Sequence, residues 1–464
     1  MLHHTGAVGP SRLWPLWLAW VSFVVYGSLV PLDFHPLPLD QAWQALLQAP
    51  MLNLGVNSRA DWVANGVLYL PVGFLSTAML MGAGRVGAGR RWWAGLFGLV
   101  FGVLLAVAVE FAQSAFPPRT VSRNDLLAES IGSGLGMLGA LVGARPFRAL
   151  LAGYGVGGGV LARRLALFYA LLFPALALFP FDLLLTAAEW RDKMNGPLVG
   201  LWLAESSLGL GIAKLVIKLS VETLAVLPLG ALWASGQRGP VAADVADKAG
   251  RRLDRRAGPG ALQCALWGAL LGLLIEGLQL TIVSGQSQGA SVLTRVIGFA
   301  AGAVAWQRCG HLTLEALRAW LRQVTAPALL VLLALLALYN GAWRGPWLSA
   351  SQAWRRLHDE VHFVPFYYHY FTTEMMALIS LLVVGLSYAP LGVLGWAWHV
   401  SPSLVVTLSL LLSSAMEISK LVAQPTHPDP SNIWIAAAAA WLAQSLMLRL
   451  SAAPGRLAPT VGNR

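Results

Sequence analysis

Eight polar residues in the first third of the chain gather at the ends of apolar segments. They are Asp61, Asn65, Glu110, Gln113, Arg119, Arg123, Asp125 and Glu129. Charged side chains are costly to place in a membrane, so they usually face the interior of a helix bundle or a wet cavity. Two carboxyl groups in different surroundings can act as general acid and base, and arginine can hold a phosphate. These residue types therefore allow a binding pocket, an acid–base active site, or a polar lock between helices.

Other candidates for chemistry are weaker. Ser114 and Ser122 have no nearby histidine in the sequence that could activate them, so a serine nucleophile is not indicated. His358 and His362 are four residues apart, a spacing that can chelate a metal from one face of a helix. The aromatic run at 365–370 that follows is typical of a membrane interface. We therefore expect ordinary interfacial histidines, with no metal and no other cofactor.

The composition indicates a membrane around these residues. Of the 464 residues, 57% are hydrophobic and only 11% are charged, against about 25% charged in soluble domains. About 20 consecutive apolar residues cross a bilayer as a helix. The twelve predicted spans are 13–31, 61–82, 94–115, 125–143, 165–184, 211–233, 261–283, 291–307, 326–343, 374–397, 403–422 and 433–450. We predict an all-α, multi-pass integral membrane protein.

A unit of four predicted spans recurs three times. Spans 2, 6 and 10 each contain a Pro-x-Gly triplet, which begins at Pro71, Pro228 and Pro390. Spans 3, 7 and 11 each end near a glutamate, and a polar residue follows fifteen positions later. These pairs are Glu110 and Asp125, Glu276 and Ser291, and Glu417 and Asn432. Small residues follow at helical spacing, which permits close helix packing.

Because four spans return the chain to the same side, the predicted repeats are parallel. We name them region 1 (residues 1–150), region 2 (residues 151–325) and region 3 (residues 326–464). After its first span, each region has a short segment with a tryptophan, at Trp43, Trp190 and Trp354. We predict that these three segments form helices at the membrane surface.

Basic residues are distributed unevenly between the predicted loops. The N-terminal tail and the loops after even-numbered spans contain 20 Lys and Arg residues, and the opposite loops contain 8. Basic loops stay in the cytoplasm, so we predict that both termini are cytoplasmic. The same rule accounts for the net charge of +11, and no nucleic-acid partner is expected.

The three regions differ in charge. Two acids of region 1, Asp61 and Glu129, are replaced by bases in region 2, and these bases can neutralise the acids of that region. Region 3 keeps one acid and one base, a single helical turn apart. The predicted structural charge pairs use Lys218, Glu222, Glu276, Arg295, Glu417 and Lys420. We therefore expect regions 2 and 3 to be closed structural copies and region 1 to be the working one.

Region 1 resembles the VanZ-like family of membrane proteins. The resemblance rests on Asn65 with residues 71–75, on Glu110 and Gln113, on residues 117–119, and on Asp125, Glu129 and Gly132. It is good over about residues 15–145, and it is degenerate but in register over 165–305 and 326–450. Family members commonly have Asn at the position of Glu129. The family is named for a protein associated with teicoplanin resistance, and related domains occur near exopolysaccharide genes. The resemblance implies a cell-envelope role in the bacterial inner membrane, and no particular biochemical activity.

These observations predict a protein that binds, moves or scaffolds a lipid or lipid-linked saccharide at an extracytoplasmic polar pocket in region 1. The expected partners are membrane lipids or a lipid-linked envelope precursor, with other envelope-assembly membrane proteins as further candidates. One alternative is an intramembrane enzyme that uses the paired carboxylates on such a substrate. The other is a ligand-free assembly factor. The lack of a convincing nucleophile favours a binding protein over an enzyme.

Overall fold

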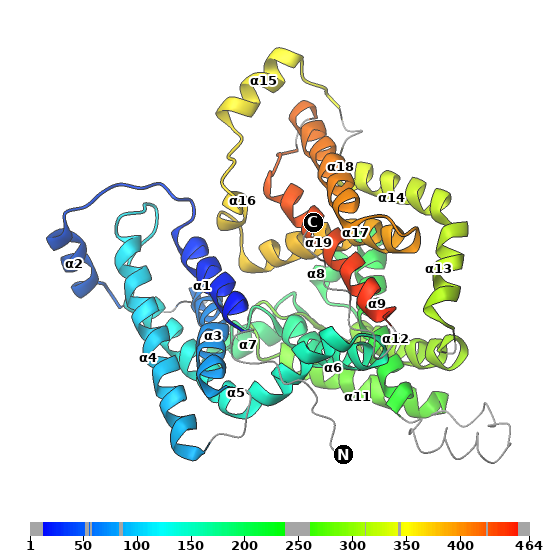
Figure 1. Cartoon of the computed structure of the whole chain (residues 1–464), viewed down its shortest axis with the longest axis horizontal. Helices are drawn as coiled ribbons and strands as arrows, with labels where there is room; N and C mark the ends of the chain where they lie inside the picture. Colours follow the sequence, from blue (N-terminus) through cyan, green and yellow to red (C-terminus); the bar gives the residue numbers. More distant parts are fainter. Residues whose placement is uncertain are drawn as a thin grey trace, which may run out of the picture. The chain divides into compact units, whose positions relative to one another are not determined.

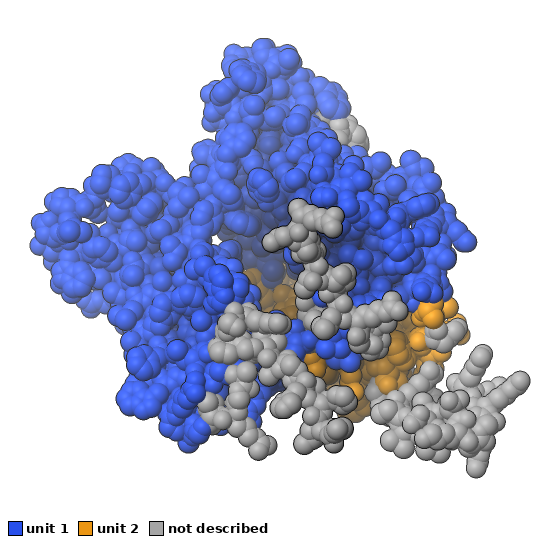
Figure 2. All heavy atoms as spheres, viewed as in Figure 1, with its two compact units in different colours: residues 1–54, 61–161, 314–464 blue, residues 55–60, 162–313 orange. Residues whose placement is uncertain are grey.

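The computed structural model describes residues 13–51, 55, 58–82, 87–236, 260–310, 312–341, 345–423 and 426–452. These residues form α-helices and one parallel pair of two-residue strands, as Figure 1 shows. They divide into two compact units (Figure 2). The first contains residues 1–54, 61–161 and 314–464, and the second contains residues 55–60 and 162–313.

The first compact unit contains the helices of regions 1 and 3, together with α13 from the end of region 2. Its N-terminal helices are α1 (Trp14–Leu29), α2 (Leu39–Leu47), α3 (Arg59–Met81), α4 (Ala88–Gln113) and α5 (Arg123–Val156). Its C-terminal helices are α13 (Leu314–Gln323), α14 (Thr325–Tyr339), α15 (Ala350–Asp359), α16 (Tyr367–Tyr370), α17 (Glu374–Ala397), α18 (Pro402–Val422) and α19 (Ser431–Leu450). In the N-terminal group α4 packs against α5, and in the C-terminal group α19 packs against both α17 and α18.

The second compact unit is built mainly from region 2. Its elements are α6 (Gly158–Leu178), α7 (Ala187–Met194), β1 (Val199–Gly200), α8 (Glu205–Leu208), α9 (Ile212–Gly236), α11 (Ala261–Gln279), β2 (Ser287–Gln288) and α12 (Gly289–Cys309). Helix α12 packs against α9 and α11. Val199 and Gly200 pair in parallel with Ser287 and Gln288, which fixes the two loops beside the helix ends.

Ten helices in the described part of the chain are long and apolar enough to cross a membrane. They coincide with ten of the twelve predicted spans, so the chain is an all-α multi-pass membrane protein. The other two predicted spans are shorter than expected. Helix α1 has 16 residues and ends at Leu29, because Val30 precedes a proline and is held in an extended conformation. Helix α14 has 15 residues and bends by 72° from α13.

Close helix contacts form at the Pro-x-Gly triplets. In each triplet the glycine packs against a backbone carbonyl of another helix, and a Cβ atom there would collide with the carbonyl oxygen. The pairs are Gly73 with Ser133, Gly230 with Phe299, and Gly392 with Ala440. The triplet prolines lie inside α3, α9 and α17, where each removes one backbone hydrogen bond.

The three segments that contain Trp43, Trp190 and Trp354 are short helices, α2, α7 and α15. Their tryptophan side chains are exposed. An exposed aromatic side chain on a short helix fits the membrane surface, so their location there stays a prediction.

Candidate functional site

Glu110 lies in the last turn of α4, and its side chain is 1% exposed. Its Oε2 atom accepts a hydrogen bond from the backbone N–H of Ser122, at 2.9 Å. Its Oε1 atom is buried and has no hydrogen-bond partner among the described residues. The segment that follows α4 thus folds back over the end of this helix. Its backbone provides a hydrogen bond to only one of the two carboxylate oxygens of Glu110.

A second buried acid lies close to Glu110. Glu129, on α5, is 2% exposed, and its Oε2 atom has no hydrogen-bond partner in the described part of the chain. The two carboxylates are near enough to interact electrostatically. Both carboxylates also interact electrostatically with the hydroxyl of Tyr69, a fully buried residue of α3. This hydroxyl has no hydrogen-bond partner among the described residues. Within the described ranges neither carboxylate forms an ion pair.

Arg119 of the α4–α5 loop and Arg123, the first residue of α5, contact backbone carbonyls. Arg119 donates from Nε to Val30 O and from Nη2 to Gly27 O, both at 2.7 Å. It thereby satisfies carbonyls at the C-terminal end of α1, which have no partner within the helix. Its guanidinium also lies 4.2 Å from the ring centroid of Tyr370, and burial lowers the pKa of Arg119. Arg123 donates to Leu47 O at 2.8 Å.

The other predicted residues of region 1 form separate contacts. Asn65 donates from Nδ2 to Asp125 Oδ1 at 2.9 Å, which links α3 to the start of α5. Gln113 is buried and donates to the carbonyl of Ser28 at 3.1 Å. Asp61 is exposed in the first turn of α3. The structure therefore brings Glu110 and Glu129 together, and it places the two arginines in contact with backbone rather than with these acids.

In region 2 the corresponding polar residues are neutralised. Arg295 Nη1 forms a buried ion pair with Glu276 Oε1. Glu276 Oε2 accepts the backbone N–H of Gln288 at 2.5 Å. Lys218 Nζ lies 3.9 Å from Glu222 Oε1, one turn along α9. The charges that region 1 leaves unpaired thus have partners here.

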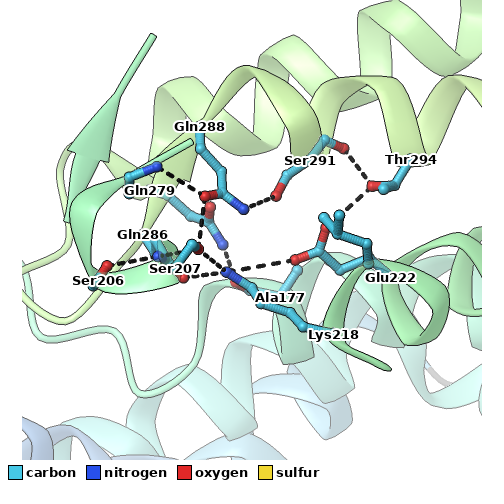
Figure 3. Close-up of polar contacts among 12 residues, drawn as sticks. Ala177, Ser206, Ser207, Lys218, Glu222, Gln279, Gln286, Gln288, Ser291 and Thr294 are labelled. Atoms are coloured by element: carbon cyan, nitrogen blue, oxygen red, sulfur yellow. Dashed lines mark hydrogen bonds and ion pairs between the residues drawn. The ribbon is translucent and has the colours of Figure 1, made fainter. Parts of the chain in front are cut away.

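A network of neutral side chains surrounds Lys218 and Glu222, as Figure 3 shows. Lys218 donates to Ser207 Oγ at 3.1 Å and also contacts Gln286 Oε1. Gln288 accepts from Ser207 Oγ at 2.8 Å and donates to Ser291 Oγ at 3.1 Å. Nothing in the sequence pattern singled out Gln286 or Gln288, because their partners lie some 80 residues away along the chain.

Region 3 neutralises its glutamate within one helix. Lys420 Nζ lies 2.7 Å from Glu417 Oε1, and both residues are on α18. Asn432 donates to the same oxygen at 2.9 Å, and the backbone N–H of Asp429 donates to Oε2 at 2.7 Å. Both oxygens of Glu417 therefore have partners, in contrast to those of Glu110.

Comparison with known families identifies the first part of the chain. Residues 15–144 match the family model described as VanZ/LLP1. The chain contains a VanZ-like domain. The match spans the eight polar residues predicted from the sequence, together with Tyr69. No curated protein and no solved structure matches the chain.

The histidines outside the VanZ-like domain are in aromatic contacts. Helix α15 ends at Asp359, so His358 and His362 do not share one continuous helix. The ring of His358 contacts Trp354 edge-on, with centroids 4.8 Å apart, and that of His362 stacks on Tyr367 at 3.9 Å. The described residues contain no group of three or more metal-ligating side chains.

A cavity of about 540 Å³ lies in region 3, outside the VanZ-like domain. It is lined by Leu348, Gln352, Arg355, Arg356, Asp359, Glu360 and His427. None of the eight residues predicted for region 1 lines this cavity. Arg356 is occupied there by an ion pair with Glu360 and by carbonyls such as that of Lys420. Arg356 is thus matched by an acid and by carbonyls around the cavity.

Proposed function

We propose that the chain consists of three copies of one four-helix unit and that the first copy, the VanZ-like domain, holds the working site. Several contacts at equivalent positions support this. The residue twelve positions after Glu110, Glu276 and Glu417 donates its backbone N–H to that glutamate. The residue five positions after each glutamate accepts a backbone hydrogen bond from the segment that follows the first helix of the copy. These pairs are His35 with Ala115, Leu184 with Thr281, and Leu348 with Val422.

The proposed role is in the cell envelope: the VanZ-like domain binds, moves or scaffolds a lipid or lipid-linked saccharide. The observation that carries this proposal is the unpaired acid pair of Glu110 and Glu129, where the other copies have neutralised glutamates. Unpaired carboxylate oxygens accept hydrogen bonds, so they would recognise a head group rich in hydroxyl groups. Arg119 is occupied by the carbonyls of α1, which favours recognition of the saccharide over the phosphate of such a lipid.

An enzyme is less well supported by the same geometry. Two carboxyl groups are present, but Ser122 Oγ accepts the backbone N–H of Asn124 at 3.1 Å and is buried. It is thus held as part of the loop that covers Glu110. The ligand-free assembly factor remains the second candidate, because Glu110 is almost fully buried and a ligand reaches it only if the 114–122 loop moves.

The glutamine variant Glu110→Gln is expected to lose bound lipid while the protein stays folded, because the side chain keeps its shape but no longer accepts hydrogen bonds at both terminal atoms. Native mass spectrometry of lipids that co-purify with the protein measures this. The matched control is Glu315→Gln, which changes an exposed acid on α13. Wild-type amounts of the same lipids on Glu110→Gln would remove Glu110 from the site.

Arg119→Ala is expected to lower the melting temperature in detergent, because the carbonyls of Gly27 and Val30 lose their hydrogen-bond donor.

We also propose that the Glu110 end of the domain faces away from the cytoplasm of a bacterial inner membrane. Reporter fusions after Arg91, Arg256 and Arg322 should then report a cytoplasmic position, because the basic loops stay inside. Fusions near Pro118 and Gln286 should report the opposite side. Two or more reversed readings would contradict both the orientation and the division into three copies of four spans.

A further inference from the structure

A row of buried polar atoms continues from the acid pair into the VanZ-like domain. Ser133 Oγ and Thr77 Oγ1 are fully buried, and neither has a hydrogen-bond partner among the described residues. Ser133 lies against Gly102 of α4, and Thr77 lies against Gly98, one helical turn further from Glu110. Glu110, Ser133 and Thr77 are therefore arranged in order along α4.

The equivalent positions of region 2 are apolar. Counting from the proline of the triplet and from the position of Glu129, the residues that replace Tyr69, Thr77 and Ser133 are Val226, Ala234 and Phe299. All three belong to one hydrophobic core cluster. Region 3 keeps a buried tyrosine, Tyr388, at the position of Tyr69, but it has Trp396 and Ala440 in place of Thr77 and Ser133. The two hydroxyls of Thr77 and Ser133 are thus found in the VanZ-like domain alone of the three regions, and the four-helix fold does not require them.

Charged groups around the pair do not compensate it by ion pairing. On the described elements, the titratable groups that interact with the pair are Tyr69, Asp125 and Arg119. Asp125 carries the same sign of charge, and Arg119 is hydrogen-bonded to the carbonyls of α1. Two buried carboxylates without a partner cation are strongly disfavoured when both are charged, and a proton on one of them removes this cost and supplies a donor.

We propose that Glu110 and Glu129, together with the hydroxyl of Tyr69, form a proton-binding site, and that the buried hydroxyls of Ser133 and Thr77 extend its polar lining along α4. In this site one carboxylate takes a proton from hydronium of the surrounding solution, which becomes water, and the resulting carboxylic acid donates its O–H to the other carboxylate. The buried hydroxyl of Tyr69 has no partner in the described part of the chain, so it is available as a second donor to the pair. The proposal does not depend on the lipid ligand.

Infrared spectroscopy of the purified full-length protein in a detergent that contains no ester group, with no lipid added, tests this site. At neutral pH the wild-type protein should show the C=O stretching band of a protonated carboxyl group, and the band should shift in D₂O. Glu110→Gln and Glu129→Gln should each change the band. It should be lost in the variant that removes the protonated carboxyl group, and it should shift in the other, because the remaining acid no longer has a carboxylate to donate to. The control Glu315→Gln should keep it.

A second variant tests whether the hydroxyl faces the pair. Tyr69→Phe removes only the OH group, so the band should remain but move to higher frequency, because the carboxyl loses a hydrogen bond. Absence of the band in the wild-type protein, or an unchanged band in both glutamine variants, would overturn the proton site. An unshifted band in Tyr69→Phe would exclude Tyr69 from it. Since no lipid ligand enters these measurements, their failure would leave the lipid-binding proposal to its own test.

Discussion

Replacing Arg295 by alanine is expected to destabilise the protein by about 3–5 kcal/mol, the cost of removing one partner of a buried ion pair. Arg295 is 5% exposed and Glu276 is 6% exposed, so water cannot take the place of the lost guanidinium. Glu276 would retain the backbone N–H of Gln288, which satisfies one of its two oxygens. Denaturant or thermal unfolding in detergent measures the loss, and Arg308→Ala on the exposed end of α12 is the matched control.

The double variant Glu276→Gln and Arg295→Gln should recover much of this loss, because no charge is left buried and the two amides can hydrogen-bond to each other. Activity or lipid binding should also persist in the double variant if region 2 only supports the fold. A double variant that is folded but has lost lipid binding would show that region 2 belongs to the site. The division of labour between the copies would then be wrong.

The sequence predicted the membrane helices well where length and composition alone decide them. Ten apolar runs became spanning helices. The exceptions arise from local backbone chemistry: Val30, which precedes a proline, ends α1 early, and a bend between α13 and α14 divides the ninth predicted span. His362 fell outside the helix that the i, i+4 spacing assumed, because α15 had already ended at Asp359.

Within the site, the sequence grouped Glu110 and Glu129 with two other acids, and it did not predict what would compensate them. The 19-residue spacing that places Arg295 on Glu276 also brings Glu129 near Glu110. The role of Arg119 was not predictable, because its carbonyl partners lie about 90 residues earlier in the chain. Tyr69 was missed because a tyrosine in an apolar span is ordinarily a packing residue. Only the lack of a partner for its hydroxyl among the residues that the structure describes distinguishes it.

Converting the VanZ-like domain to the charge pattern of region 2 is expected to preserve its fold and abolish its function. The double variant Tyr69→Val and Glu129→Arg reproduces Val226 and Arg295 at the equivalent positions. The valine makes room for the longer side chain, and the new arginine can then pair with Glu110 as Arg295 pairs with Glu276. Unfolding should occur near the wild-type midpoint, while bound lipid and the protonated-carboxyl band should both disappear.

The new ion pair can be tested by adding Glu110→Gln to this double variant. The triple variant would bury an arginine without a carboxylate, so it should lose about 3–5 kcal/mol relative to the double variant. The same Glu110→Gln change in the wild-type background should cost much less, because no base depends on Glu110 there. If Glu110→Gln costs the same in both backgrounds, the introduced arginine does not reach Glu110, and the two regions are not equivalent at this position. A double variant that still binds lipid would instead show that the unpaired acids are not what distinguishes the working copy.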